Sequence, residues 1–252
     1  MAVAEDITAA DERPVNLEKV RVHGTAPRPS DATTGYKPDT TRSTGPWGDR
    51  NIKDVPYSIT VLPEDLIENV SARNVDQLFK VAPLVEAGQS QDVNNIVQAT
   101  VRGFNVARAY VNGVQNNNLG MGVFVEEIGQ LEIIGGLSGF MYGASPVGGT
   151  IHYQVKRPDG SDIRKVTVGD YGGGQYYVHA DLGGSAGPGN RFGYRFNLLK
   201  QDGDTQVYGQ SLDRGMLSGS MDWRPTDDLV LQLAISRKRY ELDGRQFQFF
   251  LG

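Results

Sequence analysis

Hydrophobic and polar positions alternate with a period of two in the C-terminal part of the chain, from residue 161 onward. The clearest runs are residues 191–198, 217–223 and 229–236. Such alternation predicts strands with one apolar face and one polar face. The connections at residues 185–190 and 225–228 are short, whereas residues 201–214 form a longer polar connection. The pattern therefore predicts an antiparallel sheet of about five strands.

The apolar faces of these strands admit two interpretations. In a soluble sandwich they form the core, whereas in a transmembrane barrel they face lipid and the polar faces line a wet lumen. Aromatic residues close to the strand ends fit the interfacial girdle of a barrel, and they are Tyr171, Tyr176, Tyr177, Phe192, Trp223 and Tyr240. The periodicity slightly favours the barrel and leaves the sandwich open.

Residues 51–158 show shorter and more mixed patterns, which predict an α+β domain. Residues 57–62 alternate as a strand does, and Pro63 with the acids after it begins a helix. Ser71 is expected to cap the N-terminus of a second helix, which ends near Pro83. Short strands are expected between polar loops at residues 96–103, 109–114, 130–134 and 150–155.

Residues 1–50 are polar and rich in proline, so they are expected to form a flexible arm. One island interrupts this arm and consists of Leu17, Glu18, Lys19, Val20, Arg21 and Val22. Its alternation suits a short strand with nothing local to pair with, and such a strand can add to the sheet edge of a partner. A stray apolar patch in a tail explains the island equally well.

The composition excludes several classes of protein. The net charge of −5 and the interspersed basic residues predict no nucleic-acid interface. Without cysteine there is neither a disulfide framework nor a thiolate site. No run of about 18 apolar residues predicts a transmembrane helix. Small residues at positions 2–4 fit the end of a signal-peptide cleavage site as well as they fit chance.

The stretch YGASPVGGT, residues 142–150, resembles a phosphate-binding loop, but a glycine stands where that loop needs its lysine. The alternating residues after it predict a strand instead of the required helix, so a chain reversal is the better interpretation. His23, His152 and His179 are scattered, and Glu126 with Glu127 has no nucleophile beside it. We therefore expect no enzyme, no cofactor and no metal site.

Five segments occur in an order that is typical of one family, and they are residues 101–104, 110–114, 130–134, 142–149 and 155–158. In this order, VRGF, YVNGV, QLEII, YGASPVGG and VKRP resemble the plug domain of TonB-dependent outer-membrane receptors, most of all the ferric-siderophore branch. The resemblance covers about 200 residues. It implies a periplasmic arm at residues 1–50, a plug domain at 51–158 and the first strands of a transmembrane β-barrel at 161–252.

The resemblance also implies roles for particular residues. Leu17 to Val22 are then the TonB box, the strand that the energy-transducing partner TonB captures. The amide-rich plug loops face the ligand, which makes the expected ligand contacts Asn94, Asn95, Asn105, Arg108, Asn116, Asn117 and Asn118. Arg102 and Glu132 match plug positions that dock on the barrel wall, although ordinary surface charges remain an alternative. His152 takes the place of the usual asparagine.

A family barrel has about 22 strands, but the alternating region accounts for only about five. An open sheet cannot span lipid because its edge amides lack partners. The chain as given is therefore expected to be a truncated N-terminal part of a receptor that takes up ferric siderophore, an iron chelate, across the outer membrane. The full-length form contacts outer-membrane lipid, whereas the fragment itself is placed in the periplasm. The alternatives are a stand-alone soluble plug-type binding protein and a receptor for cobalamin, haem or an oligosaccharide.

Overall fold

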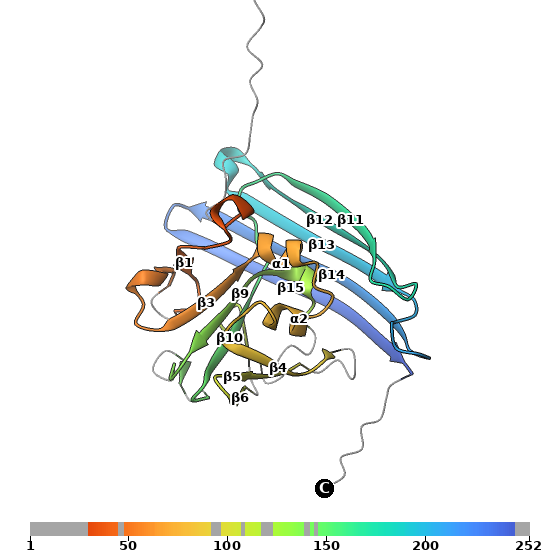
Figure 1. The fold of residues 1–252 in the computed structure, drawn as a ribbon. Helices are drawn as coiled ribbons and strands as arrows, with labels where there is room; N and C mark the ends of the chain where they lie inside the picture. The colour runs from red at the N-terminus through yellow and green to blue at the C-terminus, as the bar shows by residue number, and fades with distance from the viewer. Residues whose placement is uncertain are drawn as a thin grey trace, which may run out of the picture.

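The computed structural model describes residues 30–44, 48–91, 97–106, 109–116, 123–138, 142–143 and 146–244. These residues form two bodies that lie side by side, a small mixed α+β body and a large curved antiparallel sheet (Figure 1). Among the residues described, no helix is long and apolar enough to cross a lipid bilayer. The predicted fold class, a plug-like body followed by an open antiparallel sheet, is confirmed, while the predicted domain bounds stay a prediction.

The smaller body is built on a five-stranded mixed sheet in the order β3-β9-β10-β7-β8. Its strands are β3 (Ser58–Pro63), β7 (Ala109–Val111), β8 (Val114–Asn116), β9 (Ile128–Gly135) and β10 (Gly149–Val155). Strand β10 runs parallel to β7, and the other neighbours are antiparallel. The remaining elements are β1 (Thr40–Thr41), β2 (Arg50–Asn51), β4 (Val85–Gln89), β5 (Gln98–Val101), β6 (Phe104–Val106), α1 (Glu64–Val70), α2 (Val75–Phe79) and the 3-10 turns η1 (Ala32–Thr34), η3 (Ile52–Asp54) and η4 (Val125–Glu127).

The core of this body lies between the two helices and the sheets. Ile67 of α1, Leu78 and Phe79 of α2, and Ile133 and Ile151 of the central strands are almost fully buried and belong to one cluster. Residues 131–135 of β9 are buried at every position because both of its faces are covered. Burying each large apolar side chain stabilises the fold by about 1.5–3 kcal/mol, so this cluster holds the body together.

The predicted start of the first helix agrees with the structure, whereas the predicted start of the second helix does not. Helix α1 begins directly after Pro63 and has Glu64 and Asp65 in its first turn, as expected. The prediction that Ser71 caps the second helix is wrong. Ser71 instead ends α1 with a left-handed backbone at φ 51°, and its N–H donates to the carbonyl of Glu68. Asn74 precedes α2, because residues 71–74 are needed to reverse the chain between the helices.

The large sheet is an antiparallel meander in the order β11-β12-β13-β14-β15. Its strands are β11 (Ile163–Asp170), β12 (Tyr176–Ala186), β13 (Phe192–Asp202), β14 (Ser211–Thr226) and β15 (Leu229–Asp243), with the turn η5 (Pro188–Asn190) between β12 and β13. The three alternating runs are confirmed as strands. The predicted connection at 201–214 is shorter in the structure, because the ladder between β13 and β14 extends to the pair Gln201 and Arg214.

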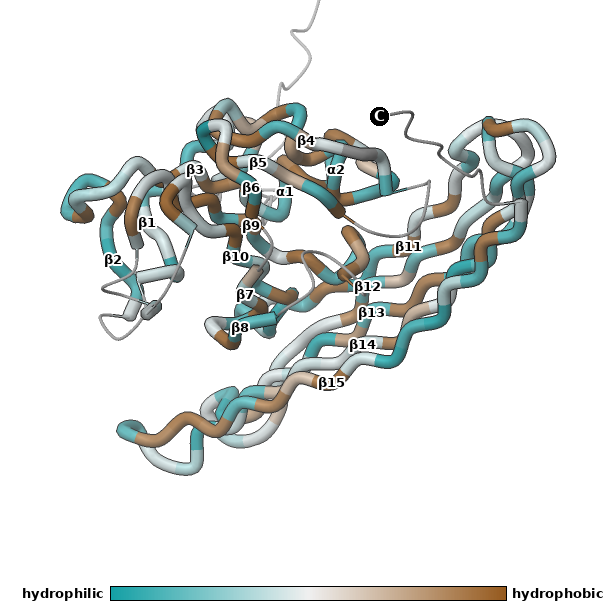
Figure 2. Tube along the Cα trace, turned by 90° about the horizontal axis from the view of Figure 1, so that it is seen from below, coloured by the Kyte–Doolittle hydropathy of each residue, from teal (hydrophilic) through white to brown (hydrophobic). Residues whose placement is uncertain are grey.

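The polarity of the two faces of the large sheet is the reverse of that in a soluble protein, which buries its apolar face. On β12, β13 and β14 the face toward the plug-like body is mainly polar and buried, and it includes Asp181, Arg195, Asn197, Arg214 and Asp222. The opposite face is apolar and exposed, with Leu217 at 53%, Leu233 at 58% and Ile235 at 70% exposure. Figure 2 shows the resulting alternation of hydrophilic and hydrophobic residues along the strands. The sandwich interpretation therefore does not hold within the described residues.

The predicted aromatic girdle is only partly present. Tyr176, Phe192 and Trp223 are exposed on the sheet, as a girdle requires. Tyr171 instead stacks on Tyr177 with ring centroids 4.3 Å apart. Tyr177 and Tyr240 pack against the buried cluster of Phe124, Leu199 and Met216, which joins the sheet to the smaller body. The prediction is wrong for these three tyrosines, because Tyr177 and Tyr240 lie on the inner face of their strands and Tyr171 lies in the turn after β11, where it stacks on Tyr177.

Candidate functional site

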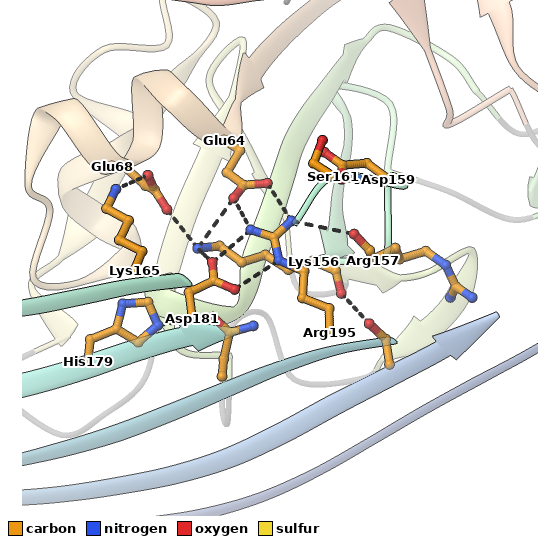
Figure 3. A network of polar contacts seen from close by, with 12 residues as sticks. Glu64, Glu68, Lys156, Arg157, Asp159, Ser161, Lys165, His179, Asp181 and Arg195 are labelled. Carbon is orange, nitrogen blue, oxygen red and sulfur yellow. Dashed lines mark hydrogen bonds and ion pairs between the residues drawn. The ribbon is translucent and has the colours of Figure 1, made fainter. Parts of the chain in front are cut away.

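Charged side chains from both bodies meet in a buried band, which we call the ionic interface (Figure 3). The smaller body contributes Glu64 and Glu68 of α1, Glu126 and Glu127 of η4, and Lys156 and Arg157 after β10; the large sheet contributes Lys165, Asp181, Arg195, Arg214, Asp222 and Lys238. None of these residues is among the predicted docking residues.

Lys156 lies at the centre of the interface and is 4% exposed. Its ammonium is 2.8 Å from Glu68 Oε1, 2.8 Å from Asp181 Oδ2 and 3.5 Å from Glu64 Oε1. Burial on its own lowers the pKa of Lys156, but the three carboxylates outweigh burial and raise this pKa above its ordinary value. Burial likewise raises the pKa of Glu68, but Lys156 and Lys165 bring it below its ordinary value. Each partner thus keeps the other charged.

One oxygen each of Glu64, Glu68 and Asp181 lie within 4.8 Å of one another, which is close enough to surround a cation. The chain itself supplies the positive charge. Besides Lys156, Arg195 binds Asp181 in a bidentate manner, with Nε to Oδ1 at 2.9 Å and Nη2 to Oδ2 at 2.7 Å. Arg195 also binds Glu64, with Nη1 to Oε2 at 3.1 Å. The three acids therefore act as a cradle for two basic side chains.

The local sequence explains how these residues converge. Glu64 and Glu68 are four positions apart on α1, so they share one face of the helix. Asp181 and Arg195 lie on neighbouring strands, two pairs apart in the ladder, and both are buried on the face toward the smaller body. These two signals, an i, i+4 acid pair and charges on the face opposite to an apolar strand face, are present in the sequence. Glu64 and Arg195 are 131 positions apart in the chain, so the sequence does not reveal that they form a pair.

A second contact is made by η4 and the residue before it. Phe124 is 1% exposed, and the guanidinium of Arg214 lies 4.9 Å from its ring centroid. Arg214 also binds Glu126, with Nη2 to Oε1 at 2.8 Å. Glu127 pairs with Lys238 and accepts a hydrogen bond of 3.1 Å from Ser236. Glu126 and Glu127, which have no nucleophile beside them in the sequence, each form an ion pair with a basic residue of the large sheet.

A third contact joins the segment after β10 to β14. Arg157 forms an ion pair with Asp222, which is buried. The hydroxyl of Ser220 donates to the carbonyl of Lys156 at 2.7 Å. The two bodies are therefore joined at three places by ion pairs and hydrogen bonds. Those bonds in which a charged group takes part are stronger than hydrogen bonds between neutral groups.

The predicted ligand contacts are described only in part. Asn105 is exposed on β6, and Asn116 ends β8, so the two lie in different sheets. The other predicted contacts lie outside the described residues, and they are Asn94, Asn95, Arg108, Asn117 and Asn118. The predicted TonB box, Leu17 to Val22, also lies outside them. Both assignments stay predictions.

The two residues predicted to dock the plug differ in their surroundings. Arg102 is exposed and has a left-handed backbone at φ 54°, and its side chain lies beside Gly136. Glu132 is fully buried, but its bonds run to residues 41–43 and to Gln130 instead of to the large sheet. Within the described residues, docking is carried by the ionic interface, and the docking role of Arg102 stays a prediction.

The glycine-rich stretch leads into a strand, as the chain-reversal interpretation predicts. Residues 149–155 form β10 where a phosphate loop needs a helix. A Cβ at Gly148 would lie 2.2 Å from the carbonyl oxygen of Val101, and one at Gly149 would lie 2.1 Å from that of Ile134. These glycines are required because the backbone passes close to β5 and β9.

Comparison with known proteins supports this fold. Residues 51–150 match the family model of the TonB-dependent receptor plug domain. The ferric-pyoverdine 358 receptor of Pseudomonas putida is 24% identical over 243 residues, which cover 94% of this chain and 29% of that receptor. The ferrichrome receptor FcuA of Yersinia enterocolitica is 26% identical over 70% of this chain and 24% of its own length.

Solved structures agree with the sequence relatives. The structure of Pseudomonas aeruginosa FpvA bound to a heterologous pyoverdine superposes with a TM-score of 0.75 at 17% identity, and the match covers 84% of this chain and 29% of FpvA. The chain thus spans about 29% of the length of the first of these relatives. Residues 51–150 thus resemble the plug domain of TonB-dependent receptors, and an open antiparallel sheet follows them along the chain.

Proposed function

We propose that this chain is part of an outer-membrane receptor that takes up ferric siderophores with energy delivered by TonB. The single observation that carries the proposal is the inside-out sheet, which turns an apolar face outward and holds the plug on its polar face. A wall of this kind suits lipid on one side and a wet lumen on the other. The relatives named as ferric-pyoverdine and ferrichrome receptors support an iron chelate as the ligand.

The chemistry of the ionic interface suits a plug that has to move. Its contacts are ion pairs and hydrogen bonds, with one small apolar cluster around Phe124. When such a contact opens, water replaces the lost partners, so the net cost per hydrogen bond is about 0.5–1.5 kcal/mol, and about 1.5–3 kcal/mol where a charge takes part. Opening an apolar interface would instead expose its whole apolar area to water, at a free-energy cost that grows with that area. The plug is therefore held firmly while it is docked and is released without unfolding of its own core.

The proposal assigns ligand binding and TonB binding to two different parts of the chain. We assign ligand contact to the amide side chains of Asn105 on β6 and Asn116 at the end of β8, because amide groups bind polar chelates through hydrogen bonds. We assign TonB capture to Leu17 to Val22, because the alternation of apolar and charged residues in their sequence suits strand addition. In this proposal, ligand binds at these amide groups and a pull on the arm then shifts the plug.

Deletion of residues 16–23 from a whole receptor that contains this sequence tests the proposal. We expect uptake of radiolabelled ferric chelate by iron-starved cells to be lost, while binding of the chelate to the same cells at 0 °C is retained, because binding does not need the energy transducer. A matched deletion of residues 5–12 is the control and should leave uptake intact. Unchanged uptake after deletion of residues 16–23 would contradict the proposal.

A further inference from the structure

The carboxylate of Glu132 binds the N-terminal segment to the middle of the plug. Its Oε1 accepts a hydrogen bond of 2.8 Å from the backbone N–H of Arg42, and its Oε2 accepts one of 3.0 Å from the N–H of Ser43. The hydroxyl of Thr41 donates to Oε2, and Gln130 Nε2 donates to Oε1 at 2.7 Å. Both oxygens are thus used, and three of the four donors come from consecutive residues of one segment.

Two other attachments of this segment are weaker. Strands β1 and β2 pair over only two residue pairs, Thr40 with Asn51 and Thr41 with Arg50. Farther upstream, Tyr36 accepts a hydrogen bond of 2.9 Å from Asn69, and this contact is exposed. By contrast, Thr41, Ser43 and Glu132 are at most 1% exposed. Bonds to a buried carboxylate are charge-assisted and hidden from water, so Glu132 holds the segment more tightly than these contacts do.

Arg42 of this segment also lines two clefts between the plug and the large sheet. One cleft has a volume of about 640 Å³ and is bordered by Asn112 and Gln154 of the plug and by Asp222 of the sheet. The other has a volume of about 430 Å³ and is bordered by Gln130 of the plug and Arg195 of the sheet. Three residues line both clefts, and they are Arg42, Arg157 and Pro158. Arg42 is the residue whose N–H is held by Glu132.

We propose that Glu132 is a release latch, which holds residues 41–43 as a partition between the two clefts until the arm is pulled. A pull from upstream of residue 30 loads the exposed contacts first and reaches the bonds of Glu132 last. When these bonds break, Arg42 leaves the boundary and the two clefts join into one passage along the large sheet. This latch rests on the proposed function, because breaking the bonds of Glu132 would be the first structural change that a pull on the arm causes.

Hydrogen–deuterium exchange tests the latch in the full 252-residue chain, purified in detergent. In Glu132→Gln, the amide side chain keeps one accepting oxygen and loses the other, so one of the two backbone N–H groups of Arg42 and Ser43 loses its acceptor. We expect exchange at these two amides to rise by about tenfold or more, while the central strands β9 and β10 stay protected. Thr41→Val removes a single donor and gives a smaller rise, which keeps the test valid if Glu132→Gln folds poorly.

Glu127→Gln serves as the matched control, because it removes a buried plug carboxylate that binds the large sheet and not residues 41–43. It should leave exchange at Arg42 and Ser43 unchanged. Equal exchange in wild type, Glu132→Gln and Thr41→Val would overturn the latch, and so would an equal rise in Glu127→Gln.

The joining of the clefts has its own measurement. The chain has no cysteine, so Gln154→Cys provides a single thiol in the first cleft. We expect a bulky maleimide to label this thiol faster when Glu132→Gln is added, by the same factor as the rise in amide exchange. An unchanged labelling rate would overturn the partition. Neither measurement involves TonB or a siderophore, so failure of the latch and failure of the uptake proposal are separate results.

Discussion

His152 is buried within the plug and shows how one residue couples the fold to pH. Its ring stacks on Tyr110 with centroids 4.6 Å apart and an interplanar angle of 9°. Its Nε2 lies 2.9 Å from Thr150 Oγ1, and its Nδ1 has no hydrogen-bond partner among the described residues. Burial lowers the pKa of His152 from 6.5 to about 3. Glu132 lies opposite His152 in the ladder, but its oxygens are bound to residues 41–43 and to Gln130. A proton on the ring would therefore be a buried charge without an ion pair among the described residues.

We therefore expect acid to destabilise the plug through His152. Because the folded pKa lies below the unfolded pKa, the unfolded state binds the proton first, and stability is lost as the pH falls from 6.5 toward 3. The slope is at most about 1.4 kcal/mol per pH unit. Chemical unfolding in detergent at pH 7 and pH 5 measures it. His152→Asn should remove most of the difference, and an equal loss of stability in both proteins would contradict the role of this ring.

Lys156 and Lys165 both bind Glu68 but differ in burial, so they form a matched pair for mutation. The side chain of Lys156 is 2% exposed and that of Lys165 is 51% exposed. Lys156→Met leaves Glu64, Glu68 and Asp181 close together without their central cation. We expect a loss of about 3–5 kcal/mol in the free energy of unfolding, against at most about 1 kcal/mol for Lys165→Met. Equal effects in thermal unfolding would show that burial does not set the strength of this interface.

At the scale of elements, η4 and the residue before it bind the last two strands of the large sheet that the structure describes. The side chains of Phe124 and Glu126 contact Arg214 on β14, and Glu127 contacts Lys238 on β15. Both cations also lie over the ring of Phe124, at 4.9 Å and 5.8 Å from its centroid. One short turn therefore binds two strands at once.

A double-mutant cycle measures this contact. We expect Glu126→Gln and Arg214→Met to show a coupling of about 1–3 kcal/mol in unfolding free energy, because the two groups share a buried hydrogen bond. The pair Glu126→Gln and Lys238→Met is the control, and its coupling should stay below about 0.5 kcal/mol. Equal coupling in both pairs would mean that η4 is held by the general field of the sheet and not by specific pairs.

The elements also show what the sequence reveals and what it does not. Strands β13 and β14 were predictable because one face is more exposed than the other, which produces an apolar and polar alternation with a period of two. Strand β15 shows the same alternation in its sequence, although its residues 229–237 are exposed on both faces. Strand β9 is buried on both faces, so its extent was underestimated at both ends. Ser71 was misassigned because serine suits a helix start, while the structure uses it in a left-handed turn at φ 51°.

The ionic interface was missed for a different reason. Its pairs join residues that are far apart in the chain, 88 positions for Glu126 and Arg214 and 111 for Glu127 and Lys238. No local pattern specifies which acid meets which base. The inward charges of Asp181, Arg195 and Asp222 do show, however, that the polar face of the sheet has to meet a polar partner. Their identity as docking residues follows only when the plug is placed against them.

At the scale of the whole molecule, the arrangement of polarity is the reverse of that in a soluble protein. The plug has its own apolar core, the contact between plug and sheet is mainly ionic, and the largest set of exposed apolar side chains lies on the outer face of the sheet. Water covers this outer face only at a cost of roughly 25 cal/mol per Å². The outer face therefore needs an apolar environment, which lipid supplies in the proposed receptor.

The outer face leads to a prediction about the chain as it stands. Purified without detergent, it should bind to lipid vesicles in a flotation assay, although its open sheet edges keep it from spanning them. Leu233→Lys together with Ile235→Lys places two charges on this face, each costing up to about 2–4 kcal/mol in lipid, so vesicle binding should fall by more than tenfold. Leu137→Lys changes a residue that is 67% exposed on the plug and should leave binding unchanged. A chain that stays monomeric in water and ignores vesicles would instead favour a soluble plug-type binding protein, because the outer face would then tolerate water without a partner.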